Sequence, residues 1–200
     1  MRKFLIFVLT LFVFFGCSKD EDVMEKPTIL NVGEKVELVS TNGAKLNFKR
    51  IDNGFVIDGD EDKIIIFDVF GTFCEPCKRE APALMKMQLD YNDKLMFVGL
   101  SYFEDVDNEY IIEKFQKPHN AFYFIAANSP KNKALVDTIL QDIKYERMIS
   151  LPFKVVINRG KYEVVTDKWE NKTDTKFYIG DVGTELIKAD IEKIIKNNES

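Results

Sequence analysis

A short apolar run followed closely by two cysteines places the strongest constraint on the fold of this chain. Residues 64–70 (Ile-Ile-Ile-Phe-Asp-Val-Phe) have the length and side chains of a buried β-strand. Cys74 and Cys77 follow with two residues between them, and helix-compatible residues come next. A C-x-x-C pair at a strand-to-helix junction is typical of a redox site. The sequence therefore predicts an α/β protein with thiol chemistry at the start of a helix.

The residues around the first cysteine favour its ionised form. Pro76 suits the first turn of a helix, where its missing N–H would have no partner in any case. Cys74 then lies at the positive end of the helix dipole, near backbone N–H groups that the helix leaves free. Such an environment stabilises a thiolate, which is the nucleophilic form of cysteine.

The N-terminus has the pattern of an export signal. Arg2 and Lys3 precede an apolar run over residues 4–15, which is as long as a signal-peptide core and too short to span a membrane. The run ends at Gly16-Cys17, and this junction resembles the lipobox of bacterial lipoproteins, which implies cleavage before Cys17 and lipidation of that cysteine. A secreted protein with a free Cys17, or an uncleaved anchor, is the alternative. Each of these predicts export to a compartment where disulfides can form.

These observations divide the chain into a signal peptide at 1–16, a lipidated tether at 17–30 and a folded domain at 31–200. The tether is polar and charged over residues 18–26 and has little to bury. The chain has three cysteines, so lipidation of Cys17 leaves one redox couple. The net charge of -5 lacks the basic surplus typical of nucleic-acid binding.

The remaining pattern alternates strands with helices. Strands are predicted at residues 36–39, 45–48, 55–57, 95–100 and 121–127, and in a hairpin at 153–157 and 162–165. Helices are predicted from Cys77 to about 91 and at 109–116, 131–144 and 184–197. The lone Trp169 is expected in the core or in a strand. The order of elements predicts a central mixed β-sheet flanked by helices, with an N-terminal β extension.

Residues 67–82 (Phe-Asp-Val-Phe-Gly-Thr-Phe-Cys-Glu-Pro-Cys-Lys-Arg-Glu-Ala-Pro) carry a family resemblance. They resemble the active-site signature of thioredoxin-fold proteins, and most closely the exported, membrane-tethered branch that includes ResA and TlpA. The resemblance implies a thioredoxin-like fold and thiol–disulfide oxidoreductase activity. It makes Cys74 the attacking nucleophile, exposed at the helix start, and Cys77 the thiol that resolves the mixed disulfide. No cofactor is expected beyond the redox-active Cys74–Cys77 disulfide. No metal is expected either, because a zinc site needs about four ligands and the sequence offers these two thiols and the distant His119.

The resemblance also implies carboxyl groups that act on the thiols. Asp68 corresponds to a buried acid beneath the second cysteine, where burial would raise its pKa and suit proton exchange with Cys77. Alternatively, the side chain of Asp68 points elsewhere, toward a partner such as Lys63. Glu80 corresponds to a glutamate that tunes the thiols, and its alternative is a solvated first-turn residue. Glu75 is expected to act similarly from a more exposed position.

A partner-binding edge is implied beside the cysteines. Pro152 corresponds to a cis-proline that faces the C-x-x-C, and Leu151 before it would offer backbone groups to a partner peptide. Phe73, Glu75 and Pro76 complete the predicted contact surface. Phe73 stands where the family usually has tryptophan.

The leading functional hypothesis is a lipid-anchored protein-disulfide reductase of the cell envelope that faces the periplasm or the cell exterior; inner and outer membrane both stay open. Its implied clients are exported proteins, with apo-cytochrome c as the most natural one, and its implied electron donor is a membrane thiol relay. One alternative is a disulfide oxidase or isomerase. Another is a Cu(I)-handling lipoprotein that uses Cys74, Cys77 and His119, because thiolates select Cu(I).

Overall fold

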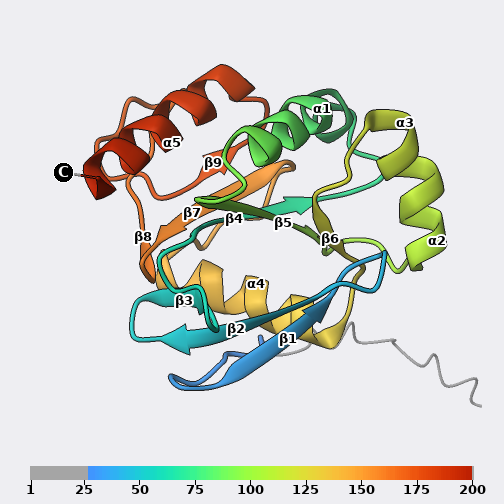
Figure 1. Ribbon diagram of the computed structural model, residues 1–200, viewed down its shortest axis with the longest axis horizontal. Helices are drawn as coiled ribbons and strands as arrows, with labels where there is room; N and C mark the ends of the chain where they lie inside the picture. Colours follow the sequence, from blue (N-terminus) through green and yellow to red (C-terminus); the bar gives the residue numbers. More distant parts are fainter. Residues whose placement is uncertain (1–26, 200) are drawn as a thin grey trace, which may run out of the picture.

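A computed structural model describes residues 27–199 of the chain (Figure 1). The predicted signal peptide, most of the predicted tether and the predicted lipidation site at Cys17 lie outside these residues. The described chain forms two sheets, with strand order β1-β2-β3 in the smaller and β6-β5-β4-β7-β8 in the central one, where β9 also pairs with β7. Their strands are β1 (Lys35–Val39), β2 (Lys45–Ile51), β3 (Gly54–Ile57), β4 (Ile64–Phe70), β5 (Leu95–Ser101), β6 (Phe124–Ala126), β7 (Phe153–Asn158), β8 (Lys161–Tyr162) and β9 (Tyr178–Ile179).

The central sheet is mixed, as the sequence predicts. Strands β4, β5 and β6 run parallel, and β7 pairs antiparallel with β4, with β8 and with β9. All seven residues of β4 are buried. Its apolar character, interrupted only at Asp68, follows from this position, because a strand covered on both faces needs apolar side chains on both sides.

The helices cover both faces of this sheet. They are α1 (Glu75–Asp90), α2 (Asn108–Ile111), the π-helical turn η1 (Ile112–Gln116), α3 (Lys117–His119), α4 (Pro130–Asp142) and α5 (Thr184–Asn198). Figure 1 shows α1 and α5 on one face, with α4 and the smaller sheet on the other.

Alternate side chains of β4 pack in the two halves of the core. Ile64 and Ile66 pack in the half that holds the buried residues of α1 and α5. Ile65 and Phe67 pack in the other half, with the buried residues of α4 and of β1–β3. The period-two alternation of a strand produces this division.

The structure corrects several predicted boundaries. Strand β6 is shorter than predicted, the second strand of the hairpin is limited to Lys161–Tyr162, and β9 was not anticipated. Trp169, expected in the core or in a strand, lies in a turn and is 55% exposed. Just before the predicted start of the domain, Leu30 is buried and donates its N–H to Thr138 Oγ1 of α4 at 3.0 Å.

Within residues 27–199, no helix has both the length and the apolar character needed to cross a membrane.

Candidate redox site

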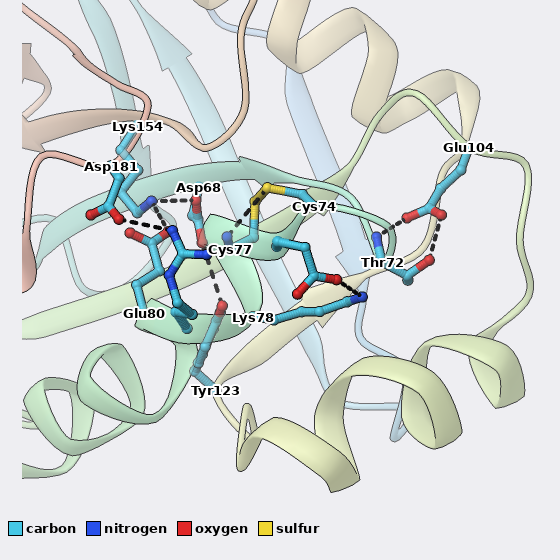
Figure 2. Close-up of a disulfide and its surroundings, with 12 residues drawn as sticks. Asp68, Thr72, Cys74, Cys77, Lys78, Glu80, Glu104, Tyr123, Lys154 and Asp181 are labelled. Carbon is cyan, nitrogen blue, oxygen red and sulfur yellow. Dashed lines mark hydrogen bonds and ion pairs between the residues drawn. A yellow bond between two sulfur atoms is a disulfide. The ribbon is translucent and has the colours of Figure 1, made fainter.

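A disulfide joins Cys74 and Cys77 at the start of α1, with an S–S length of 2.04 Å (Figure 2). Cys74 is the N-cap, and its Sγ accepts a hydrogen bond from the Cys77 N–H at 3.2 Å. Pro76 lies in the first turn. The helix N-terminus therefore supplies the donor that the sequence predicts for a thiolate at Cys74.

Both sulfur-bearing residues are largely covered in this oxidised state. Cys74 is 6% exposed, which is less than the sequence suggests, and Cys77 is 1% exposed. Cys74 is still the more accessible of the two. This order agrees with an attacking Cys74 and a resolving Cys77, because the resolving thiol acts within the protein.

A buried charged cluster on the sheet accompanies the disulfide. Asp68 of β4 and Lys154 of β7 lie directly opposite each other across the two strands, with Lys154 Nζ 3.0 Å from Asp68 Oδ1. Lys154 Nζ also contacts Glu80 Oε1 of α1 as a hydrogen bond and ion pair. The Tyr123 hydroxyl points to Asp68 Oδ2 at 3.4 Å. Figure 2 shows this cluster on the Cys77 side of the disulfide.

The cluster members are almost completely removed from solvent. Asp68 and Lys154 are each 1% exposed and Glu80 is 7% exposed. A buried charge is strongly unfavourable unless it is paired, so each ion pair here compensates a large loss of hydration. Asp68 therefore has Lys154 as its ionic partner, whereas Lys63 pairs with Asp60 at 3.0 Å. Glu80 is a buried residue and not a solvated one.

Burial and neighbouring charges shift the pKa values in this cluster. Burial raises the pKa of Glu80 to about 7, against the opposing attraction of Lys154, and the negative charge of Asp68 adds to the rise. For Lys154, burial lowers the pKa, but the carboxylates of Asp68 and Glu80 outweigh it and hold the pKa above its ordinary value. Burial raises the pKa of Tyr123 well above its ordinary value. Glu80 therefore gains or loses its proton near neutral pH.

The cis-proline loop lies against the same region. The Leu151–Pro152 peptide bond is cis, as the resemblance implies. Leu151 packs against the core half that contains both cysteines. A Cβ on Gly71 would lie 2.8 Å from the Phe73 ring and 3.2 Å from Leu151, so the lack of a side chain at Gly71 leaves room for both. Phe73 itself is 60% exposed. Phe73 and Leu151 therefore border one surface next to the disulfide.

Glu75 turns away from the charged cluster. Its carboxylate pairs with Lys78 Nζ at 2.6 Å on the solvent side of α1, and this hydrogen bond lowers the pKa of Glu75. Its position is exposed, as the sequence predicts, but it is engaged with Lys78.

Two residues near the site were not predicted from the sequence. Lys154 is one, and Glu104 in the loop after β5 is the other. Glu104 accepts hydrogen bonds from the backbone N–H of Thr72 and from Thr72 Oγ1, the latter at 2.6 Å (Figure 2). Lys154 could have been singled out from the sequence, because a lysine inside an apolar strand is unusual. Glu104 could not, because an acid in a polar loop is ordinary.

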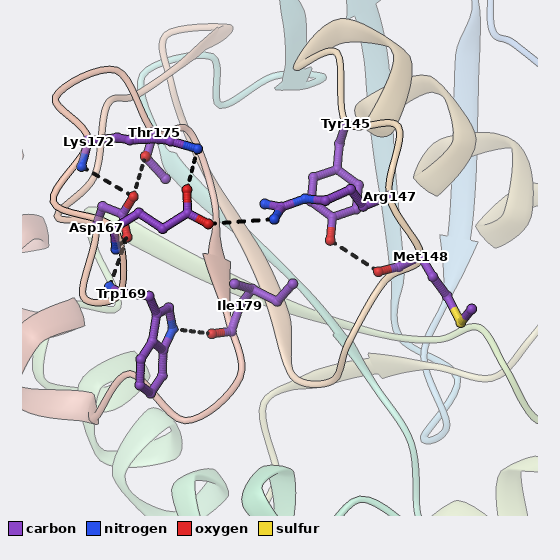
Figure 3. Close-up of polar contacts among 9 residues, drawn as sticks. Tyr145, Arg147, Met148, Asp167, Trp169, Lys172, Thr175 and Ile179 are labelled. Atoms are coloured by element: carbon purple, nitrogen blue, oxygen red, sulfur yellow. Dashed lines mark hydrogen bonds and ion pairs between the residues drawn. The ribbon is translucent and has the colours of Figure 1, made fainter.

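Residues 163–181, which run from the end of β8 past β9, extend the surface next to Pro152. The Gly180 N–H donates to the Pro152 carbonyl at 2.8 Å, and Arg79 of α1 pairs with Asp181 at 3.1 Å. Trp169 Nε1 donates to the Ile179 carbonyl at 2.8 Å (Figure 3). A groove of about 660 Å³ lies between this segment and residues 142–147.

Among residues 27–199, no group of three or more His, Cys, Asp or Glu side chains is placed to hold a metal ion.

Comparison with known proteins gives short sequence matches and a longer structural match at low sequence identity. No family model matches the chain. The thioredoxin-like protein YneN of Bacillus subtilis is 38% identical over 40 residues, which cover 20% of this chain and 24% of that protein. Thioredoxin-T of Drosophila melanogaster is 31% identical over 85 residues, which cover 38% of this chain and 54% of that protein. The matches thus span about a quarter and about half of the length of these relatives.

A solved structure covers more of the chain. The thiol:disulfide interchange protein of the thioredoxin family from Chlorobium tepidum aligns with a TM-score of 0.53 and 16% identity, over 84% of this chain and 97% of that one. The chain is therefore a thioredoxin-fold protein, and the fold prediction is confirmed. In the present chain, the Cys74–Cys77 disulfide lies at the start of α1, the helix that follows β4.

Proposed function

We propose that this protein is a thiol–disulfide oxidoreductase that reduces disulfides of exported proteins. The observation that carries the proposal is the Cys74–Cys77 disulfide at the α1 N-terminus, where the more accessible sulfur accepts a backbone hydrogen bond. A structural role accounts for this disulfide poorly, because a bridge between residues three apart closes almost no loop and stabilises little.

In the reducing direction, the Cys74 thiolate attacks one sulfur of the partner's disulfide. A mixed disulfide forms, and the partner's other sulfur leaves as a thiolate. Cys77 then loses its proton to the buried carboxyl cluster and attacks Cys74 Sγ, which releases the partner's second thiolate. Two electrons pass from the cysteine pair to the partner, and the pair ends as the disulfide. A thiol donor must return two electrons, and we propose a membrane thiol relay for this step.

The partner would bind along the surface formed by Phe73, Pro76, Leu151 and Pro152. Exposed Phe73 would offer an apolar contact, and Leu151, before the cis-proline, would offer backbone groups beside the disulfide. Glu75, tied to Lys78, would contribute charge at the rim.

The reducing direction is supported by the acidic surroundings. Strong oxidants need a very stable thiolate, whereas the carboxyl groups of Asp68 and Glu80 disfavour additional negative charge nearby. The resemblance to the ResA and TlpA branch favours the same direction and suggests apo-cytochrome c as a client. We place the protein at the cell envelope by lipidation of Cys17, with the domain on the exported side, on the strength of the N-terminal sequence.

The proposal is tested on the full chain with Cys17→Ser, which leaves Cys74 and Cys77 as the two thiols. A further Cys77→Ser substitution is combined with a synthetic peptide that carries an oxidised C-x-x-C-H segment. We expect the peptide to remain attached to Cys74, and a matched Cys74→Ser variant to capture none. Equal capture by both variants, or by neither, would contradict the proposed roles.

The direction is tested separately by redox titration of the Cys74–Cys77 pair. Thioredoxin-like reductases have midpoints of about -270 mV, whereas strong oxidants lie at about -120 mV. A midpoint near the second value would favour the oxidase alternative and overturn the reductase assignment.

A further inference from the structure

Lys154 contacts both carboxyl groups next to the cysteine pair. It reaches Asp68 from the facing strand and Glu80 from the helix that bears the cysteines. Lysine is rarely buried without a partner, and here its whole side chain is enclosed. With all three groups ionised, the cluster has two negative charges and one positive charge. The positive charge of Lys154 opposes the effect of burial on the pKa of Glu80.

We propose that Lys154 is a positioning residue for proton transfer. It bridges Asp68 and Glu80 so that one of these two carboxyl groups stays ionised and can accept the proton of Cys77. This inference rests on the proposed function, because it concerns the resolution step. When Cys77 attacks the mixed disulfide, its S–H bond breaks and the proton passes to the carboxyl cluster. The new S–S bond forms as the partner's thiolate leaves, so atoms and electrons balance.

The charges on every side of the cluster support this role. Tyr123, from the segment before β6, faces Asp68. Tyr178 of β9 lies opposite Lys154 in the sheet, but its hydroxyl donates to Asp190 at 2.7 Å and so points away from the cluster. Asp181 adds negative charge near Glu80 and is itself paired with Arg79. Lys154 is thus the cation in direct contact with both carboxyl groups.

Loss of the ammonium group would change the protonation of the cluster. Two buried carboxyl groups without a cation repel each other, and at least one pKa rises until a proton is bound. Without the cation the pKa of the second buried carboxyl group rises as well, so an ionised carboxylate that can accept the Cys77 proton would exist only at a higher pH. Lys154→Met keeps the approximate length of the side chain and removes the charge.

The experiment uses the reduced full chain with Cys17→Ser and the aromatic disulfide 5,5′-dithiobis(2-nitrobenzoate). Attack by Cys74 releases one coloured thiolate, and resolution by Cys77 releases a second. Stopped-flow measurement from about pH 5 to 9 separates the two phases. The second phase reports the proposed step, and the first phase serves as an internal reference.

We expect Lys154→Met to move the pH midpoint of the second phase upward by about one unit or more, as expected for a lost charge contact. The first phase should change much less. Lys86→Met is the matched control, because Lys86 lies on α1, the helix that starts at the cysteine pair, in an exposed pair with Asp90. An unchanged second-phase midpoint, or an equal shift in both phases, would overturn the inference.

A second comparison covers the case in which Lys154→Met does not fold. In an Asp68→Asn background, Lys154→Met leaves Glu80 as the single carboxyl group, which can be buried as the neutral acid. We expect the same upward shift relative to Asp68→Asn, and no shift would overturn the proposed role of Lys154. Failure to release two thiolates in the Cys17→Ser parent would instead count against the proposed function.

Discussion

At the scale of single residues, Glu80 links the charged cluster to the stability of the fold. Its pKa is raised from 4.5 to about 7 by burial, so the native state binds a proton that the unfolded chain releases between these pH values. Stability must therefore fall as pH rises through this window, by up to about 3 kcal/mol for the full shift. Glu80→Gln is neutral at every pH. We expect it to remove most of this fall, measured by urea unfolding of the oxidised protein at pH 5 and pH 7.5.

Glu75→Gln is the matched control for this prediction. Glu75 lies on the same helix but is exposed, and its pKa is lowered by the hydrogen bond to Lys78. Any stability it contributes is lost at pH values below the tested window. The assigned environment of Glu80 would be contradicted if the free energy of unfolding changed equally between pH 5 and pH 7.5 in the wild-type protein and in Glu80→Gln.

The same cluster marks how far sequence reasoning reaches for individual side chains. Asp68 and Glu80 could be singled out, because an acid in an apolar strand and an acid one turn after a C-x-x-C are both locally unusual. Lys154 also interrupts an apolar strand, yet its significance depends on which strand lies beside it. The register that places Lys154 opposite Asp68 is a property of the folded sheet, and the chain separates the two by more than eighty residues.

At the scale of elements, the turn between β4 and α1 is held by a contact from another loop. Thr72 is 6% exposed, and Glu104 accepts both its backbone N–H and its hydroxyl proton. Glu104→Ala removes the acceptor for both groups. A buried donor left without an acceptor costs about 1–3 kcal/mol, so we expect a loss of this size in the free energy of unfolding. Urea unfolding of the oxidised protein measures it.

Asp105→Ala provides the control, because this neighbouring acid in the same loop is exposed. Its effect should stay within about 0.5 kcal/mol, as for most surface substitutions. If Glu104→Ala were equally mild, water would have to replace the carboxylate at Thr72, and the turn would not depend on Glu104.

Elements with a strong local pattern were predictable, and those defined by their neighbours were not. Strands β4 and β5 and helices α4 and α5 carry long apolar patterns that match their observed bounds within a few residues. Strand β9 has two residues and exists because Tyr178 and Ile179 pair with β7. Such a short segment has no periodicity of its own, so pairing with β7 defines it.

At the scale of the whole molecule, a buried ion pair joins the smaller sheet to α4 and the central sheet. Arg50 of β2 is 6% exposed, and its Nη2 lies 2.6 Å from Asp142 Oδ1 at the end of α4. The Tyr162 hydroxyl of β8 donates to the other oxygen of Asp142 at 2.8 Å. Three elements thus meet at one carboxylate. This junction predicts that the β1–β3 extension unfolds together with the rest of the described chain.

Arg50→Met tests this coupling, because it keeps apolar bulk and leaves Asp142 without its cation. Removing one partner of a buried pair costs about 3–5 kcal/mol, and we expect a loss of this order in one cooperative unfolding transition. Lys35→Met is the matched control, since Lys35 of β1 lies in the same sheet but pairs with Asp58 in solvent, where a pair contributes about 0–1 kcal/mol. Unfolding is followed by Trp169 fluorescence and by amide hydrogen exchange in β1–β3. Early exchange of β1–β3, well before the fluorescence change, would show that the extension is a separate unit and that the Arg50–Asp142 pair does not couple it to the rest of the described chain.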